Sequence, residues 1–317
     1  MTAGLRVVVI LGSTATGKSG LALKVAERFD SEVVSADSRY LYRGMDIGTA
    51  KPSLAELLSV PHHLVNVVEP RDDFSLATFL DDAFAAIEGI GSRSRLPVVA
   101  GGTPLYLRAL LQGWRVPRVA PDETLRAELE LQETAELFRA VQDVDPASAQ
   151  RIGPANTRRL IRALEVFKAS GQPMSELEGK QPPPYRFLVL GLRQEREALY
   201  RRIDERVRCM FANGLLDEAR ELLERGVSPE TPAMSAIGYP EARAVLLDEL
   251  DLEEAIERTS FATHRYVRHQ ETWFRKFENI HWLDSASAGY VDEALSLVGQ
   301  FLFDQPDVTG EPEPADS

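Results

Sequence analysis

Residues 5–19, LRVVVILGSTATGKS, decide the fold of this chain. The first half is an apolar run broken only by Arg6, which is typical of a strand buried on both faces of a sheet. The second half fits the pattern G-x-x-x-x-G-K-S, and the helical stretch LALKVAERF follows closely. A strand, this glycine-rich turn and a helix in that order favour a phosphate-binding P-loop over a chance glycine turn. The predicted cradle consists of Gly12, Ser13, Thr14, Ala15, Thr16, Gly17, Lys18 and Ser19.

Each part of this cradle has a task on a phosphate ligand. The glycines let backbone N–H groups curl around phosphate oxygens at the positive end of the helix. Lys18 neutralises the outer phosphates, and Ser19 offers its hydroxyl to a phosphate-bound Mg²⁺. The motif alone leaves open which phosphate compound binds.

The rest of the chain predicts a parallel sheet built from two segments of the sequence. Apolar strands lie in EVVSAD (32–37) and LPVVAGGT (96–103), with helical stretches between them. The segment 123–143 is helical and acidic, and RFLVLGL (186–192) returns to the strand pattern. We therefore expect an α/β fold, with a P-loop NTPase-like parallel sheet, flanking helices and a small all-helical insertion domain. The predicted divisions are 1–113 and 146–303 for the core, 114–145 for the insertion and 304–317 for a disordered acidic tail.

Composition excludes several classes of protein. The chain has 317 residues, with 36 basic and 49 acidic side chains and a net charge of −13. Its one cysteine, Cys209, excludes an internal disulfide, and no apolar stretch approaches the roughly 20 residues that span a bilayer. These features predict a cytoplasmic protein with no membrane partner. The negative charge does not exclude a nucleic acid, because the tail 304–317 holds five acids and no base, while 151–168 and 258–276 are locally basic.

Asp37 is the one acid that follows a predicted core strand closely, since the later strands end in VVAGGT and VLGL. It would lie beside the P-loop if its strand neighbours the first strand. A single carboxylate there could organise a metal ion, accept a proton or only cap the next turn. The residues themselves leave these three roles open.

Around Asp37 the chain reads VVSADSRYLYRGMDIGTAKP, followed by VPHHLVNVVEP and VVAGGTPLYLRALLQG. The pattern continues through RRLIRALEVFKASGQPMS, YRRIDERVRCMFANGLLDEA, SAIGYPEA and THRYVRHQETWFRKF. In this order, over about residues 5–285, the segments resemble the tRNA dimethylallyltransferase family. The resemblance implies transfer of a dimethylallyl group from dimethylallyl diphosphate to N6 of the adenosine 3′ of the anticodon, at position 37. The tRNAs concerned read codons that start with U, and the product is N6-isopentenyladenosine.

The resemblance also implies roles for residues around the cradle. Asp37 accepts the N6 proton, and Thr103 of GGT hydrogen-bonds near the reacting centre, although Thr103 could instead cap the following helix. Arg202 and Arg206 lie four residues apart on one helix face and stabilise the departing diphosphate, with Mg²⁺ as cofactor. The alternative for each arginine is a solvated surface position.

The predicted tRNA partner is the anticodon stem-loop, whose adenosine must leave the loop stack to reach a buried site. The resemblance implies contacts in the first part of the core from Asp37, Ser38, Arg39, Tyr40 and Thr103. Later in the chain it implies contacts from Arg126, Arg158, Arg159, Leu160, Ile161, Arg162, Arg265 and Arg268. A solvated basic face is the alternative for each arginine cluster. We expect a monomer.

The chain departs from the family pattern at Ser13 and Thr16, which preserve the cradle, and in three further places. Tyr40 stands where many relatives carry glutamine, so it can stack or donate one hydrogen bond but cannot make a bidentate contact. His269 stands where arginine is common, which weakens one phosphate contact at neutral pH. The insertion 114–145 is short and acidic.

Three other functions remain open at this stage. A small-metabolite kinase would need a second magnesium-binding acid, and a prenyltransferase acting on free adenine nucleotides would not need the long arginine-bearing C-terminal half. A nucleotide-gated RNA-binding protein without catalysis could lose Asp37 or Thr103. His62 and His63 could suggest a metal site, but adjacent residues of an extended segment point to opposite sides, which favours structural hydrogen bonds.

Overall fold

The computed structural model describes residues 4–304, so the predicted tail beyond Asp304 lies outside the described residues. The chain divides into two compact units. The first comprises residues 4–73, 82–107 and 184–304, and the second comprises 74–81 and 108–183. Within residues 4–304, no helix is both long and apolar enough to cross a bilayer.

The first unit is built on a six-stranded sheet whose paired strands all run parallel. In sheet order the strands are β3 (His62–His63), β2 (Ser31–Ser35), β4 (Leu96–Gly101), β1 (Leu5–Gly12), β7 (Tyr185–Arg193) and β8 (Ile280–Asp284). The helices are α1 (Lys18–Arg28), α2 (Leu54–Ser59), α10 (Arg196–Ala212), α11 (Leu215–Glu224), α12 (Tyr239–Leu246), α13 (Leu252–Phe274) and α14 (Tyr290–Phe303). Helices α3 (Leu76–Ser92) and α4 (Pro104–Gln112) each contribute residues to both units.

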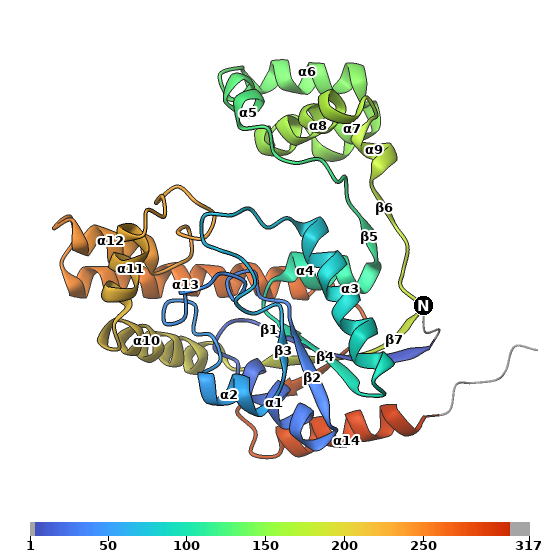
Figure 1. Cartoon of the computed structure of the whole chain (residues 1–317), viewed down its shortest axis with the longest axis vertical. Helices are drawn as coiled ribbons and strands as arrows, with labels where there is room; N and C mark the ends of the chain where they lie inside the picture. Colours follow the sequence, from blue (N-terminus) through green and yellow to red (C-terminus); the bar gives the residue numbers. More distant parts are fainter. Residues whose placement is uncertain (1–3, 305–317) are drawn as a thin grey trace, which may run out of the picture. The chain divides into compact units, whose positions relative to one another are not determined.

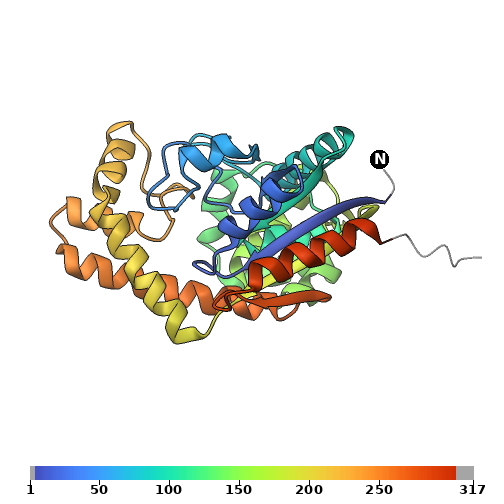
Figure 2. The same cartoon turned by 90° about the horizontal axis from the view of Figure 1, so that it is seen from below.

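The parallel sheet explains the apolar runs in the sequence. Val8 and Ile10 of β1 pack with α1 and α14 on one face, and Figures 1 and 2 show these two helices side by side along the sheet. Val7 and Val9 alternate with them and are fully buried too. A strand that buries both of its faces needs apolar residues at every position.

The strand order differs from the simplest expectation for Asp37. Strand β4, not β2, pairs with β1 on this side, so the strand that leads to Asp37 lies one place further away. The C-terminal ends of β2 and β4 nevertheless lie very close together. A Cβ on Gly101 would lie only 2.2 Å from the Ala36 carbonyl oxygen. Glycine at this position lets the two strand ends approach closely, and Asp37 still reaches the P-loop edge.

The second unit is larger than the insertion 114–145 that the sequence predicted. It contains β5 (Trp114–Arg115), α5 (Glu123–Glu130), α6 (Thr134–Val144), α7 (Pro146–Ile152), α8 (Thr157–Ser170), α9 (Met174–Leu177) and β6 (Gly179–Lys180). The predicted helical stretch 123–143 is divided between the two helices α5 and α6. Helix α8 joins this unit because its apolar side packs with α5 and α6 in one core, which includes Leu137, Val141, Leu160 and Val166.

Candidate active site

The P-loop has the predicted geometry between β1 and α1. A Cβ on Gly12 would lie 2.6 Å from the Leu192 carbonyl oxygen, and Gly17 has a φ of +93°, which favours glycine. The buried Thr16 hydroxyl donates to the Ser13 carbonyl at 2.8 Å, and the Lys18 ammonium donates to the same oxygen at 2.7 Å. These contacts hold the loop curled at the N-terminus of α1.

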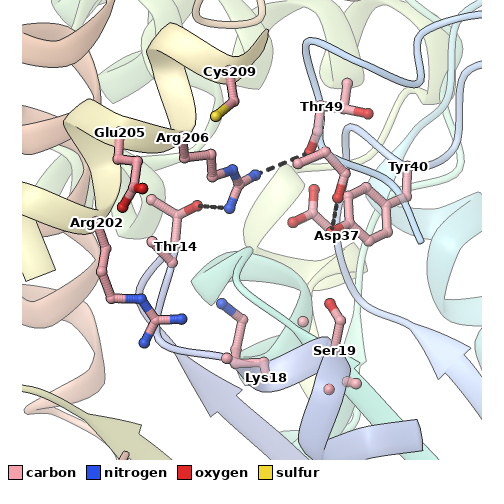
Figure 3. A pocket seen from close by; sticks show the side chains of 16 residues that line it. Thr14, Lys18, Ser19, Asp37, Tyr40, Thr49, Arg202, Glu205, Arg206 and Cys209 are labelled. Carbon is pink, nitrogen blue, oxygen red and sulfur yellow. Dashed lines mark hydrogen bonds between the residues drawn. The ribbon is translucent and has the colours of Figure 1, made fainter. Parts of the chain in front are cut away.

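A cavity of about 510 Å³ opens over this loop (Figure 3). Most of the predicted cradle lines it, together with Asp37, Tyr40 and the α10 residues Arg202, Glu205, Arg206 and Cys209. An adjoining cavity of about 370 Å³ shares Lys18, Asp37 and Arg206 with the first. The structure therefore brings together the P-loop, the end of β2 and helix α10. Glu205 is a second acid at this cavity that the sequence analysis did not predict.

Lys18 lies among opposing charges at the bottom of the cavity. Burial lowers the pKa of its ammonium to about 8, while Asp37 opposes this shift and Arg206 adds to it. An anion bound in the cradle would favour the charged form of Lys18. The cavity is therefore suited to a ligand with several negative charges.

Asp37 and Thr103 follow the neighbouring strands β2 and β4, and Thr103 contacts the residue after Asp37. The Asp37 Oδ1 accepts from the Arg39 N–H at 2.9 Å, which leaves its other carboxylate oxygen for a ligand. The Thr103 hydroxyl accepts from the Ser38 N–H at 2.9 Å and donates to the Ser38 hydroxyl at 3.3 Å. Thr103 thus fixes the turn that carries Asp37. In this role its hydroxyl binds Ser38, whereas a helix cap would bind the start of α4.

The two predicted arginines of α10 both line the cavity. The Arg206 guanidinium donates to the Thr14 hydroxyl at 3.4 Å and to the Thr49 carbonyl at 3.5 Å (Figure 3). Both partners are neutral and both bonds are long, so the charge of Arg206 remains available to an anion. Arg202 is exposed, and its guanidinium donates to the Gln194 side chain at 3.2 Å.

Tyr40 uses its single donor inside the protein. Its hydroxyl donates to the Ala50 carbonyl at 2.8 Å, and burial, aided by Asp37, raises its pKa to about 12. Tyr40 therefore ties the turn after β2 to the loop of the DIGTAKP segment. Its ring still lines the cavity.

The DIGTAKP segment is held by a carboxylate that the sequence analysis did not select. Glu218 of α11 accepts from the backbone N–H groups of Asp46, Ile47 and Gly48 at 2.7, 2.8 and 3.0 Å. The Tyr239 hydroxyl also donates to Glu218, at 2.7 Å. The sequence signal for Glu218 was the LLDEA segment of the family pattern. The residues that it binds give no signal of their own, because Glu218 accepts from their backbone N–H groups and not from their side chains.

In the second unit, two of the predicted arginines are bound internally. The fully buried Glu165 carboxylate meets the Arg126 Nε at 2.9 Å and also pairs with the Arg162 Nη1. Arg162 donates further to the Val119 carbonyl at 2.8 Å. These contacts hold the segment before α5 against α8.

The other predicted residues of α8 divide into exposed and buried positions. Arg158 and Arg159 are exposed at the start of the helix. Leu160 is fully buried and Ile161 is 5% exposed, and both belong to the core of this unit. Their side chains are therefore packed away from solvent, and only their backbones could meet a ligand.

The remaining predicted contacts lie in the first unit. The Arg39 guanidinium donates to the Pro232 carbonyl at 2.5 Å and to the Ser235 hydroxyl at 3.3 Å, which ties it to the SAIGYP segment. Arg265 and Arg268 are exposed on α13, and Arg268 donates to the Tyr200 hydroxyl at 3.0 Å.

The adjacent histidines form structural contacts to different partners, as the sequence predicted. The His62 ring bonds the Val60 carbonyl at 2.7 Å, and the His63 ring bonds the Glu32 carboxylate at 2.8 Å. Across residues 4–304 there is no group of three His, Cys, Asp or Glu side chains that could hold a metal ion.

The fold and the cavity define a P-loop α/β protein whose phosphate cradle faces a carboxylate at the end of β2 and a guanidinium from α10. The sequence model of the IPP transferase family matches residues 40–277, and the chain belongs to this family. It is 53% identical over 305 residues to the tRNA dimethylallyltransferase of Thermomicrobium roseum, covering 95% of this chain and 93% of that protein.

Two solved structures are similar over most of the chain. The tRNA isopentenylpyrophosphate transferase of Bacillus halodurans is 38% identical with a TM-score of 0.69, over 94% of this chain and 95% of that one. A eukaryotic dimethylallyltransferase acting on tRNA is 28% identical with a TM-score of 0.82, over 96% of this chain and 81% of that one. These similarities confirm the predicted family and the P-loop NTPase-like fold.

Proposed function

We propose that the protein transfers a dimethylallyl group from dimethylallyl diphosphate to N6 of adenosine 37, next to the anticodon of tRNAs that read codons starting with U. The observation that carries this proposal is the shared cavity of Lys18, Arg206 and Asp37. It sets two cations and a P-loop, which suit a diphosphate, opposite a carboxylate, which suits a proton from an amine. The family membership supports the same reaction.

The transfer forms one bond and breaks one. The N6 nitrogen bonds the allylic carbon while the bond from that carbon to the diphosphate oxygen breaks, and its electron pair leaves with the diphosphate. Lys18, Arg206 and the P-loop N–H groups stabilise this growing negative charge. The N6 proton passes to the free carboxylate oxygen of Asp37, a contribution of about 10²–10⁴-fold to the rate.

We propose Mg²⁺ as the cofactor. Ser19 lines the cavity beside the cradle, and a single hydroxyl fits an ion that is held mainly by phosphate oxygens and water. When bound, the ion neutralises charge on the diphosphate. We further propose that the protein works in the cytoplasm as a monomer, where unmodified tRNA is its substrate.

The nucleoside must enter beside the turn 37–40, with Ser38, Thr103 and Tyr40 around it. The Tyr40 hydroxyl is already bound to Ala50, so we propose that its ring contacts the base by stacking. Arg158, Arg159, Arg265 and Arg268 are exposed, and we propose that they contact phosphates of the anticodon stem-loop.

The test is transfer of radiolabelled dimethylallyl diphosphate to unmodified tRNA, run beside free AMP and beside the variant Asp37→Asn. We expect label on tRNA alone, reduced about 10²–10⁴-fold in the variant. Label on AMP would favour the free-nucleotide enzyme. Turnover of ATP with no label on either acceptor would favour a P-loop kinase and refute the proposal.

A further inference from the structure

A buried glutamine of α13 bridges the P-loop to the loop that follows β4. Gln270 is 1% exposed, and its Oε1 accepts from the Thr14 N–H at 2.9 Å. Its Nε2 donates to the Gly102 carbonyl at 2.6 Å. Both ends of the amide are thus used, on backbone groups of two different loops.

The two loops belong to opposite sides of the proposed reaction. Thr14 is part of the phosphate cradle, and its hydroxyl also receives the Arg206 guanidinium. Gly102 precedes Thr103, whose hydroxyl holds the turn that carries Asp37. A single side chain therefore connects the diphosphate side to the side of the proton acceptor.

The packing around the Gln270 bridge leaves no room for a side chain at position 102. A Cβ on Gly102 would lie 2.9 Å from the Gln270 Nε2 and 3.4 Å from the Lys18 Nζ. A side chain at position 102 would therefore press on the Gln270 amide and come close to the cradle lysine. The Tyr266 hydroxyl also meets Gln270 and Thr103; burial raises the Tyr266 pKa, and these two contacts oppose that shift.

We propose that Gln270 is a positioning residue, which fixes the distance between the phosphate cradle and the Asp37–Thr103 pair by holding Thr14 and Gly102 at once. This inference rests on the proposed transfer reaction. A displacement of about 1 Å between reacting groups can reduce a rate by about 10²-fold, even when both substrates still bind.

The experiment compares Gln270→Met with the wild type in steady-state transfer to tRNA. The methionine has a similar length but supplies neither the acceptor nor the donor. We expect kcat to fall about 10- to 100-fold, with the KM values for the donor and for tRNA changing less than threefold. The matched control is Val267→Ala, which shortens a fully buried residue of the same helix but removes neither of the two hydrogen bonds of Gln270. We expect it to leave kcat within twofold of the wild type.

A second variant, Gln270→Glu, keeps the shape and makes the bridge depend on pH. A protonated carboxyl can accept from Thr14 and donate to Gly102, whereas the ionised form cannot donate. Burial disfavours the ionised form, so protonation should occur in an accessible range of pH. We expect the ratio of the variant kcat to the wild-type kcat to rise as the pH falls.

The outcomes separate the two proposals. Absence of transfer by the wild type would refute the proposed function and, with it, the positioning role that rests on that function. Transfer by the wild type together with an unchanged kcat in Gln270→Met would overturn the bridge. A Gln270→Glu ratio that does not vary with pH, or an equal loss of kcat in Val267→Ala, would also overturn it.

Discussion

Helices α8 and α10 each carry arginines four residues apart, yet the structure gives these arginines different surroundings. On α8, Arg162 pairs with the Glu165 carboxylate, whose side chain is fully buried. On α10, Arg206 meets only the neutral Thr14 hydroxyl and Thr49 carbonyl through hydrogen bonds. The same spacing thus produces a neutralised structural arginine in one helix and a cation at a cavity in the other. The groups around a guanidinium decide its role, and the sequence spacing does not.

The largest effect should follow from removing the α10 cation. We expect Arg206→Gln to reduce kcat/KM for the donor about 10²–10³-fold, because a group that stabilises developing negative charge is lost. Steady-state transfer at saturating tRNA measures this. Arg201→Gln is the matched control, since Arg201 is exposed on the same helix and does not line the cavity. Equal losses in the two variants would show that α10 acts only through its overall charge.

The next largest effect concerns the carboxylate on α8. Burial acts to raise the pKa of Glu165, but the Asp122 N–H and the guanidinium groups of Arg162 and Arg126 outweigh it and hold the pKa below its ordinary value. Its contribution to stability is therefore present at neutral pH and lost as the pH falls through the folded-state value. We expect Glu165→Gln to lower the free energy of unfolding by about 3 kcal/mol, since it leaves two guanidinium groups partly uncompensated.

Urea denaturation of Glu165→Gln beside Glu123→Gln tests this expectation. Glu123 pairs with the same Arg126 at 3.1 Å, but its side chain is 80% exposed, so its loss should change the stability by less than about 1 kcal/mol. Equal losses of stability in the two variants would show that the buried carboxylate contributes no more than the exposed one. The contrast between Arg162 on α8 and Arg206 on α10 would then fail.

Much of the fold was predictable because its signals are local. The strands β1, β2, β4 and β7 all lie where apolar runs occur, and the P-loop lies between β1 and α1. The strand order was not predictable, because it depends on which strands pair across the chain, as in the close approach of Gly101 to Ala36. The extent of the second unit was missed for the same reason, since the packing of α8 on α6 is a long-range contact.

In the candidate site too, the residues that belong to motifs were predicted, whereas the residues that hold them in place were missed. The P-loop, Asp37, Thr103 and Arg206 were selected from the sequence, and the structure gathers them around adjoining cavities and the turn beside them. Gln270 and Glu218 were missed because both bind backbone groups, which every residue has. A signal for Gln270 did exist: it lies with Val267 and Phe274 on the buried side of α13, where a polar residue needs an internal partner.

A smaller effect, the pH dependence of donor binding, distinguishes Lys18 from Arg206. The pKa of Lys18 is lowered to about 8, so its ammonium is charged below that pH and loses its proton above it, whereas Arg206 stays charged throughout. Donor affinity should therefore fall as the pH rises from 8 to 9, by up to about tenfold or 1.4 kcal/mol. Lys18→Arg should bind more weakly but without this dependence, and binding of the donor across pH 7–9.5 measures both. A flat profile in the wild type would contradict the role of Lys18 as the main titrating cation.

The smallest effect tests the comparison within α8 itself. Arg158 and Arg159 are exposed, while Arg162 is neutralised by Glu165, so only the first two should release counterions when RNA binds. We expect Arg158→Gln or Arg159→Gln to weaken anticodon stem-loop binding a few-fold and to reduce the slope of log K against log salt by about 0.7–0.9 each. Arg162→Gln should leave that slope unchanged and lower the unfolding free energy instead. A loss of slope in Arg162→Gln as large as in Arg158→Gln would mean that Arg162 leaves Glu165 to bind RNA, and the difference between α8 and α10 would then hold only for the protein without its substrate.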